Sequence, residues 1–559
     1  MLTTASSDRP DADGAAAQPG PVRFGWLPKR LVVAAAWAAA GIVLFFAYFG
    51  QARTAAASSN SAFEALQSWD MLHGNVLLHG WSLSDVSFYT TELPEYMLVE
   101  LVRGLNSGVV HVAAALSYAL VVLLGALLAK GRATGQEALV RVLVVGVIML
   151  APPLRIGTYL LLTGPDHIGT QVPLLLIWLV LDRARARWWV PIVVSVLLAW
   201  AQVADMIVLV EGVLPLAVVC AVRMCRRRGP LAGQWYELSL AAGALASVVV
   251  ARLAFAVLRQ AGGFFVSTPL VHFSIDAALP PRLWPKTQNL LYVFGASFHR
   301  LPYGFAAIAV PLHLFGIVLV VWALAAALRR FFSEDDLIAQ MLAVAFIALM
   351  AAYMFGSKPD ANEVVGLLPI GGVLAGRLLA SRLIRTGTVL PLAAVLACFG
   401  AVLMFDAGQP AQASKAELAR WLQAHHLSYG LAGYWQASTV TVASGDRVQI
   451  RPVRMYHHEL VTTPEESDAS WYDASRHDAR FVIWAPRKSC QNVCLSMADL
   501  RAEFGPPAVI YRVASYRVLV WRKNLLTDLP TLSWCGHGWP WAAGVKPAPA
   551  QCSENLLRL

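Results

Sequence analysis

The side chains that could carry out chemistry gather in a polar stretch, residues 50–107, between two apolar blocks of the chain. Carboxylates are prominent among them, and they are Glu64, Asp70, Asp85, Glu92, Glu95 and Glu100. A carboxylate among aromatic and apolar neighbours has its pKa raised towards the range of a general base. We therefore expect a base that takes a proton from an acceptor hydroxyl, with Asp85, Glu92 and Asp70 as candidates. The alternative is a charged loop that is simply solvated.

Further residues could hold an anion such as a phosphate group. Asp166 and His167 lie in a short polar turn between two apolar blocks, where an ordinary Asx-type turn is the alternative. Arg155 lies inside the apolar block before them, and a guanidinium there needs an anionic partner unless it snorkels to the interface. Lys286 and Arg300 belong to a second long polar loop. The four basic residues are the candidates for binding an anionic substrate, and Asp166 is the alternative partner of Arg155.

The composition indicates which elements must position these side chains. Of the 559 residues, 57% are apolar and only 14% are charged, and the apolar residues come in blocks long enough to cross a bilayer. This excludes a soluble enzyme and predicts a polytopic α-helical membrane protein. Eleven transmembrane helices are predicted: 31–49, 109–129, 142–162, 171–181, two between 187 and 223, 238–258, 305–328, 337–355, 364–376 and 389–405.

The basic residues predict how these helices are oriented. Nineteen Lys and Arg fall in the segments predicted to be cytoplasmic, against seven in the predicted outer loops. We therefore expect the N-terminus inside and the C-terminus outside. The net charge of +10 is largely this orientation signal, so membrane lipids are expected partners and nucleic acid is not.

Three regions are predicted along the chain. Residues 1–28 have the composition of a disordered cytoplasmic tail, and residues 29–405 form the transmembrane domain, with large outer loops at 50–107 and 259–303. Residues 406–559 form an extracytoplasmic α/β domain. Its predicted elements are a helix at 415–425 and β-rich runs at 439–442, 448–450, 481–484, 509–513 and 516–521.

Two segments of the first outer loop, 63–72 and 96–105, have apolar residues at helical spacing. Both would suit amphipathic helices lying on the outer leaflet, with Arg103 at the headgroups. The alternative is a pair of ordinary helices packed on the protein.

Cysteine placement is consistent with an oxidising compartment for the C-terminal region. Four of the seven cysteines lie there: Cys490, Cys494, Cys535 and Cys552. An even number favours disulfides, with Cys490–Cys494 and Cys535–Cys552 the most economical of three pairings. Their spacing does not match standard zinc sites.

Other catalytic motifs are not found. The sequence has no Walker A motif, no dinucleotide glycine fingerprint after a strand, no H-E-x-x-H and no G-x-S-x-G. His457 and His458 are adjacent and would point in different directions, so no metal site is assigned. No cofactor is expected with certainty, and a divalent cation is left open.

Two short motifs and the architecture resemble a known superfamily. The segment Gly430–Ala437, GLAGYWQA, looks like the G-x-x-x-Y-W-x-A segment that follows the last span in bacterial protein-mannosyltransferase-like enzymes. Leu368-Pro369 is similar to the Leu-Pro segment of their late spans. With a large acidic first outer loop and an outer C-terminal domain, the chain resembles the GT-C superfamily of membrane glycosyltransferases.

The resemblance implies a polyprenyl-phosphate sugar donor whose glycosyl unit is transferred with inversion, on the outer face, to an acceptor hydroxyl of a glycan, lipid or protein. It implies an acidic residue of the first outer loop as the base. By position this is Asp85 or Glu92. The superfamily's common Asp-Glu pair directly after the first span is missing, because Trp69-Asp70-Met71 has only its first acid.

The resemblance also implies basic residues near the membrane that hold the donor phosphate. These roles fall to Arg155, His167, Lys286 and Arg300, with Asp166, Tyr434 and Trp435 as further substrate-binding candidates. Arg outnumbers Lys 36 to 8, which favours a bacterial plasma membrane protein. The alternatives are a transporter or flippase for a lipid-linked or envelope substrate, and a non-catalytic glycan-binding relative.

Overall fold

The computed structural model describes residues 29–151, 156–184, 186–227, 234–266, 279–297, 306–357, 360–405, 411, 414–456, 459–463, 465–485 and 494–529. Several features singled out in the sequence lie outside these ranges. They are the tail 1–28, Arg155, Arg300, His457, His458, Cys490, Cys535 and Cys552.

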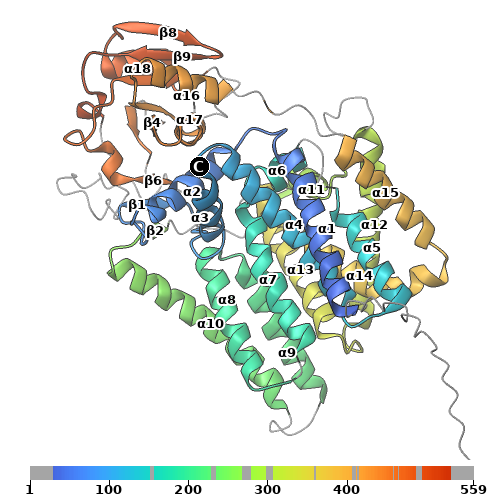
Figure 1. Cartoon of the computed structure of the whole chain (residues 1–559). Helices are drawn as coiled ribbons and strands as arrows, with labels where there is room; N and C mark the ends of the chain where they lie inside the picture. The colour runs from blue at the N-terminus through green and yellow to red at the C-terminus, as the bar shows by residue number, and fades with distance from the viewer. Residues whose placement is uncertain are drawn as a thin grey trace, which may run out of the picture.

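A bundle of helices makes up most of the molecule (Figure 1). Its helices are α1 (Lys29–Ala52), α4 (Gly108–Lys130), α5 (Gly135–Met149), α6 (Ile156–Leu162), α7 (Asp166–Arg183), α8 (Trp189–Ala204), η1 (Leu209–Val213), α9 (Leu214–Arg227), α10 (Trp235–Gln260), α11 (Leu279–Val293), α12 (Ala306–Arg330), α13 (Leu337–Phe355), η3 (Ala361–Val364), α14 (Leu367–Arg385) and α15 (Val389–Phe405).

Six helices among the described residues are long and apolar enough to cross a membrane. They are Leu31–Ala52, Gly108–Lys130, Trp235–Gln260, Ala307–Arg330, Leu337–Phe355 and Ala361–Arg385. The other segments predicted to cross are also helical but shorter, and the segment 142–162 is divided between α5 and α6. The structure therefore has the character of a multi-pass membrane protein, while the eleven crossings stay a prediction.

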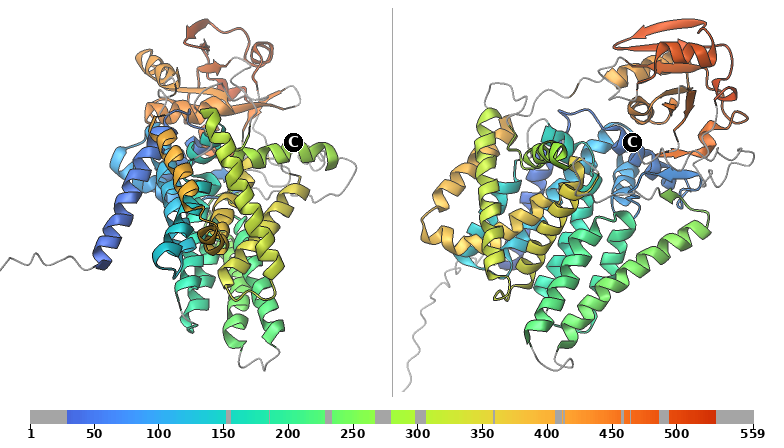
Figure 2. Two further views of the ribbon diagram at one scale, coloured as in Figure 1. Left: turned by 90° about the vertical axis from the view of Figure 1, so that its right-hand side faces the viewer. Right: turned by 180° about the vertical axis from the view of Figure 1, so that it is seen from behind.

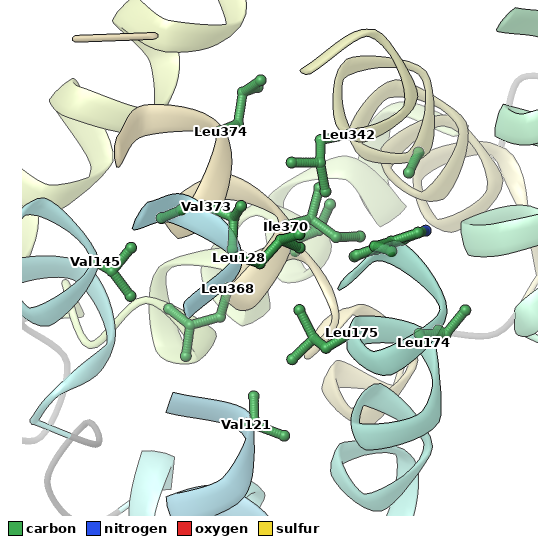
Figure 3. Close-up of a cluster of buried hydrophobic side chains, with 14 of the residues drawn as sticks. Val121, Leu128, Val145, Leu174, Leu175, Leu342, Leu368, Ile370, Val373 and Leu374 are labelled. Atoms are coloured by element: carbon green, nitrogen blue, oxygen red, sulfur yellow. The ribbon is translucent and has the colours of Figure 1, made fainter. Parts of the chain in front are cut away.

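The core of the bundle surrounds α14 (Figure 3). Leu368, Ile370 and Val373 of this helix are at most 2% exposed. They lie among buried leucines and valines of α4, α5, α7 and α13. Gly376 allows α14 to approach α5 closely, because a Cβ at this position would lie 2.8 Å from the backbone oxygen of Arg141. Close packing of this kind holds helices together where lipid offers no hydrophobic driving force.

At one end of the bundle, a buried arginine connects several helices. Arg377 of α14 forms ion pairs with Asp182 of α7, at 2.9 Å, and with Asp336 before α13, at 2.8 Å. It also donates a hydrogen bond to the carbonyl of Leu128 in α4. Four segments far apart in the sequence therefore meet here. All four belong to loops or helix ends that the charge pattern assigns to one side of the membrane.

At the other end lie the first polar loop and the C-terminal region (Figures 1 and 2). The first loop forms α2 (Ser59–Leu72), β1 (Trp81–Leu83) and α3 (Glu92–Arg103). A small sheet, in the order β2-β1-β6, joins β1 to β2 (Phe265–Val266) of the second loop and β6 (Ser467–Asp468) of the C-terminal region. All three long outer segments of the sequence therefore meet in one sheet.

The C-terminal region contains a second, mixed sheet in the order β5-β4-β3-β7-β9-β8. Its strands are β3 (Tyr429–Gly433), β4 (Gln449–Tyr456), β5 (Glu459–Thr462), β7 (Phe481–Trp484), β8 (Val509–Val513) and β9 (Tyr516–Val520), and its helices are α16 (Ser414–Ala424), α17 (Tyr434–Ser444) and α18 (Met497–Phe504). The run 439–442, predicted as a strand, is helical. It belongs to α17, which is buried against α2 and β4 and ends at Gly445 in the left-handed conformation.

The two helices of the first loop differ in their surroundings. Helix α2 is largely buried and packs against α3 and α17, which matches the expectation of a helix packed on protein. Helix α3 exposes Leu98, Leu101 and Val102, which are 67%, 68% and 86% exposed. Its apolar outward face is the one that suits a membrane surface.

Candidate active site

Carboxylates from three separate segments converge where the first loop meets the bundle. Glu64 lies on α2, Glu92 begins α3 and Asp166 begins α7. Ser61, beside Glu64 on α2, donates a hydrogen bond to Asp166, and Thr170 of α7 donates one to Glu92, so the three segments meet here. We call these three residues the acidic centre.

Glu64 is almost completely buried, at 1% exposed, as is Glu92. No N–H or hydroxyl donor among the described residues reaches either oxygen of its carboxylate. Burial raises its pKa well above the usual value, and the neighbouring Asp166 raises it further. Burial and the negative neighbours together favour the protonated form of Glu64.

Glu92 is held by two threonines. Its Oε1 accepts a hydrogen bond from Thr170 of α7 at 3.0 Å, and its other oxygen accepts one from Thr91. Gly169 makes this approach of α3 to α7 possible, because a Cβ there would lie 2.6 Å from Oε1 of Glu92. Burial raises the pKa of Glu92 to about 8, although the hydroxyl of Thr91 acts in the opposite direction.

Asp166 is the member of the acidic centre that is only partly buried. Its backbone has φ of 27°, a conformation that costs energy for a residue with a side chain. Ser61 of α2 donates a weak hydrogen bond to its Oδ1 at 3.4 Å. The sequence folds this way because Gly164 leaves room for Ser61, where a Cβ would clash. Asp166 is thus the most exposed carboxylate of the acidic centre.

A histidine and an aspartate form an ion pair beside the acidic centre. Nδ1 of His167 lies 2.6 Å from Oδ2 of Asp205, which follows the last residue of α8. Burial alone would lower the pKa of His167, but the carboxylate of Asp205 outweighs it and raises the pKa to about 10. The imidazole is therefore a cation at neutral pH.

A further buried carboxylate, Glu211 of η1, contacts α7 beyond the acidic centre. Gln171 donates a hydrogen bond to Glu211 in η1 at 2.7 Å. Gly366, just before α14, makes room for this contact, since a Cβ there would lie 2.0 Å from Oε1 of Glu211.

The C-terminal region contributes to the same end of the bundle. The hydroxyl of Tyr434 is hydrogen-bonded to the buried Glu466 and, at 2.9 Å, to Asn60 of α2. The ring of Tyr434 also lies 5.1 Å from that of Phe63, centroid to centroid. Burial raises the pKa of Glu466 to about 8. The predicted binding residue Tyr434 therefore connects the C-terminal region to the helix that carries Glu64.

The other two predicted bases lie elsewhere. Oδ2 of Asp70 accepts hydrogen bonds from Asn75 at 2.7 Å and from the indole of Trp81 at 2.8 Å, so it organises the turn between α2 and β1. Asp85 lines a cavity of about 420 Å³ together with Arg252 and Arg259 of α10. Of the three candidates, Glu92 alone belongs to the acidic centre.

The other residues predicted to bind the substrate also lie in separate parts of the molecule. The ammonium group of Lys286 donates hydrogen bonds to the carbonyls of Tyr353, at 2.6 Å, and Gly356, at 2.5 Å, where α13 ends. The indole N–H of Trp435 is buried without an acceptor among the described residues.

Cys494 is in a disulfide, while Cys220 of α9 is a free thiol.

The described residues include no group of three or more His, Cys, Asp and Glu side chains that could hold a metal ion. Three carboxylates at this end of the bundle instead accept hydrogen bonds from hydroxyl groups: Asp166 from Ser61, Glu92 from Thr170 and Glu466 from Tyr434. This arrangement suits proton transfer and hydrogen bonding to a hydroxylated ligand.

Comparison with known proteins gives a structural likeness. No family model matches the sequence. No curated protein matches it either. Among solved structures, ArnT from Cupriavidus metallidurans in the apo state superposes with a TM-score of 0.52 over 90% of this chain and 99% of ArnT, at 13% identity. The chain has the fold of ArnT.

A second structure, ArnT bound to undecaprenyl phosphate, gives a TM-score of 0.48 at 14% identity, with 88% of this chain and 98% of ArnT covered. At such identities the likeness to ArnT describes the fold. The chemistry of this chain has to be argued from its own side chains.

Four residues at this end of the bundle were not among the site candidates predicted from the sequence. They are Glu64, Asp205, Glu211 and Glu466. The signal that could have found Glu64 is its place on the apolar face of a helix, where a carboxylate is unexpected. The other three come from segments 205–211 and 465–468, whose proximity to the first loop only the fold creates.

Proposed function

We propose that this protein is a membrane glycosyltransferase of the GT-C type, which moves a sugar from a polyprenyl-phosphate donor to a hydroxyl group of an extracytoplasmic acceptor. The observation that carries the proposal is the convergence of Glu64, Glu92 and Asp166, with raised pKa values for both glutamates. The ArnT fold supports it, as does the sequence resemblance to the GT-C superfamily.

Asp166 is the proposed base, because it is the partly exposed member of the acidic centre. The acceptor oxygen forms a bond to the anomeric carbon while the bond from that carbon to the phosphate oxygen breaks. The electron pair leaves with the polyprenyl phosphate, and the hydroxyl proton passes to Asp166. Attack from the face opposite the leaving group inverts the configuration.

Glu64 and Glu92 act on Asp166 in this proposal. Glu64, kept protonated by burial, places an uncharged carboxyl group beside Asp166. Glu92, the first-loop carboxylate predicted from the sequence, contacts α7 through Thr170. Its negative charge at higher pH would favour uptake of the acceptor proton.

We assign the donor phosphate to the cavity that is lined by Asp85. Arg252 and Arg259 line this cavity, and so do Ala204 and Met206, which flank Asp205. Since Asp205 is paired with His167, the cavity adjoins the acidic centre. Two guanidinium groups provide the bidentate donors that suit a phosphate. His167, Arg155 and Arg300 stay proposed as further phosphate ligands.

The proposed location is a bacterial plasma membrane, with eleven crossings and the C-terminal region outside. Residues 29–405 would then form the transmembrane domain and residues 406–559 the extracytoplasmic domain. The acidic centre lies at the same end of the bundle as the C-terminal region, which supports a reaction on the outer face (Figure 1).

The test is sugar transfer by purified full-length protein from a polyprenyl-phosphate donor, measured as release of free polyprenyl phosphate. We expect Asp166→Asn to lower the rate by about 100-fold or more, the usual range for loss of an acid–base group. The matched control is Asp478→Asn, an exposed carboxylate in the C-terminal region.

Unchanged transfer in Asp166→Asn, Glu64→Gln and Glu92→Gln would overturn the assignment of the acidic centre. A protein that carries the donor across a liposome membrane without transferring sugar would instead be a flippase. Binding of glycan without either activity would indicate a non-catalytic relative.

A further inference from the structure

A second cavity, of about 490 Å³, lies between the bundle and the C-terminal region. Three cationic side chains line it, which are Arg53 after α1, Arg103 at the end of α3 and Lys415 in α16. The imidazole of His111 in α4 lies beside them. We call this the basic cavity. It shares no lining residue with the cavity of Asp85.

The positive charges of the basic cavity have no counter-charge in the part of the chain that the structure describes. Its described lining residues include no carboxylate. Arg53, Arg103 and Lys415 form no ion pair within 4.0 Å with any described residue. The ammonium group of Lys415 has one weak hydrogen bond, at 3.5 Å, to the carbonyl of Trp435.

Two further features favour an anion in this cavity. Nδ1 of His111 is buried without a hydrogen-bond partner among the described residues. Ser107 and Gly108, at the start of α4, also line the cavity. The N–H groups of Gly108 and Val109 already donate to Asn106, at 2.9 and 3.0 Å, so the helix contributes only the positive end of its dipole, which favours a negative charge.

The elements around the cavity indicate its position relative to the membrane. Helices α1 and α4, both long and apolar enough to span, end and begin at the cavity. Helix α3 contributes Arg103 and, from the same outer surface, exposes Leu98, Leu101 and Val102. An arginine beside an exposed apolar helical face is the pattern of a headgroup-level contact.

We propose that the basic cavity binds the phosphate headgroup of an anionic lipid of the outer leaflet. The phosphate accepts hydrogen bonds from Arg53, Arg103 and Lys415, and the acyl chains lie along the apolar face of α3. Free phosphate shares the headgroup's chemistry, but it would not use this apolar face. The site is separate from the proposed sugar-transfer site and does not depend on it.

Such a lipid would link the two parts of the molecule. Arg53, Arg103 and His111 belong to the membrane-facing part, whereas Lys415 and Thr439 come from the C-terminal region. Burial lowers the pKa of Lys415 to about 8, so an anion nearby would strengthen its charge. We expect the bound lipid to hold the C-terminal region against the bundle.

The experiment uses the full-length protein in detergent, with phosphatidylglycerol or phosphatidylcholine added and retention measured by native mass spectrometry. Phosphatidylglycerol should be retained, and phosphatidylcholine should not. The triple variant Arg53→Gln, Arg103→Gln, Lys415→Gln should bind phosphatidylglycerol about tenfold more weakly or worse, since each basic residue near a membrane adds attraction for anionic lipid. Arg420→Gln, an exposed arginine of the same helix as Lys415, is the matched control.

The single variant Arg103→Gln keeps the test usable if the triple variant fails to fold, because the Arg103 side chain is exposed. It should weaken retention of phosphatidylglycerol, and Arg103→Lys should restore part of it. Equal retention of both lipids, or unchanged retention in these variants, would overturn the proposal. Inorganic phosphate that raises the unfolding temperature as much as phosphatidylglycerol would show a free-anion site instead.

Discussion

The chemistry of single residues at the outer end of the bundle is dominated by buried charge. Glu64 has both carboxylate oxygens buried without a donor among the described residues, which costs folding free energy unless the group is protonated. His167 and Asp205, in contrast, stabilise each other as a cation and an anion. A different pH dependence follows from each of these two arrangements.

Glu64→Gln should stabilise the protein at pH 8 and impair sugar transfer. The pKa of Glu64 is raised in the folded state, so folding takes up a proton at this site above the unfolded value of 4.5. Stability is therefore lost as pH rises above about 4.5 in the native protein. The neutral amide removes this loss and can donate to Asp166. Thermal unfolding from pH 4 to pH 9 checks this, and a lower unfolding temperature of the variant at pH 8 would contradict it.

His167→Gln should remove a different part of the dependence of protein stability on pH. The pKa of His167 rises from 6.5 to about 10 on folding, so its ion pair contributes fully below pH 6.5 and is lost as pH rises towards 10. The native protein should lose stability between these values, and the variant should show a flatter profile. Thermal unfolding at pH 6, 8 and 10 measures the difference. Parallel profiles of the two proteins would refute the ion pair.

At the scale of elements, close helix contacts position the candidate site. Gly169 of α7 leaves room for the carboxylate of Glu92 at the start of α3. At the opposite end of the bundle, Arg377 holds α14 to α7 and to the start of α13. The first contact sets the geometry of the acidic centre, and the second sets the register of the helices that support it.

Gly169→Ala should displace Glu92 and destabilise the protein by about 1–3 kcal/mol, the usual cost of overpacking. The added Cβ would lie 2.6 Å from Oε1 of Glu92, closer than atoms can approach. The unfolding temperature and the rate of sugar transfer should both decrease. The control is Gly400→Ala in α15, where a Cβ meets nothing within 4 Å. Equal behaviour of the two variants would argue against the close contact between α3 and α7.

Arg377→Gln should destabilise the bundle by about 3–5 kcal/mol, because it removes the closer cation of the buried Asp182 and leaves only Arg183, at 3.4 Å. The side chains of Arg377 and Asp182 are 8% and 7% exposed. Arg385→Gln, an exposed arginine at the end of the same helix, should change stability by less than about 0.5 kcal/mol. Chemical unfolding in detergent measures both, and similar values would show that the Arg377 network contributes little.

At the scale of the whole molecule, three outer segments are joined to one end of the bundle. The small sheet pairs Ser82 of the first loop with Phe265 of the second and with Ser467 of the C-terminal region. Tyr434 extends this connection to α2. This assembly holds the C-terminal region against the end of the bundle where α2 and α3 lie (Figure 1).

The proposed orientation places this whole end outside the cytoplasm. A C-terminal fusion to alkaline phosphatase should therefore be active in cells, and a C-terminal fusion to green fluorescent protein should be dark. Fusions that end after Arg330, in a predicted inner segment, should give the reverse pattern. Fluorescence of the full-length C-terminal fusion would refute the outward orientation.

Much of the fold could be predicted because it depends on local properties of the chain. Hydropathy placed the apolar segments in helices, and the strand predictions at 481–484, 509–513 and 516–521 correspond to β7, β8 and β9. The run 439–442 was mispredicted as a strand, since its β-branched residues favour strands locally. Burial of α17 against α2 and β4 overrides that preference.

The sequence by itself determined that the chain belongs in a membrane and that many of its acids gather in polar segments between apolar ones, because composition and hydropathy are read along the chain. Only the tertiary structure decided which acids meet. Glu64, Glu92 and Asp166 are brought together by packing of α2, α3 and α7, while Asp70 and Asp85 are turned elsewhere. Spacing in sequence cannot predict such a cluster, because the contacts that create it join residues about a hundred positions apart.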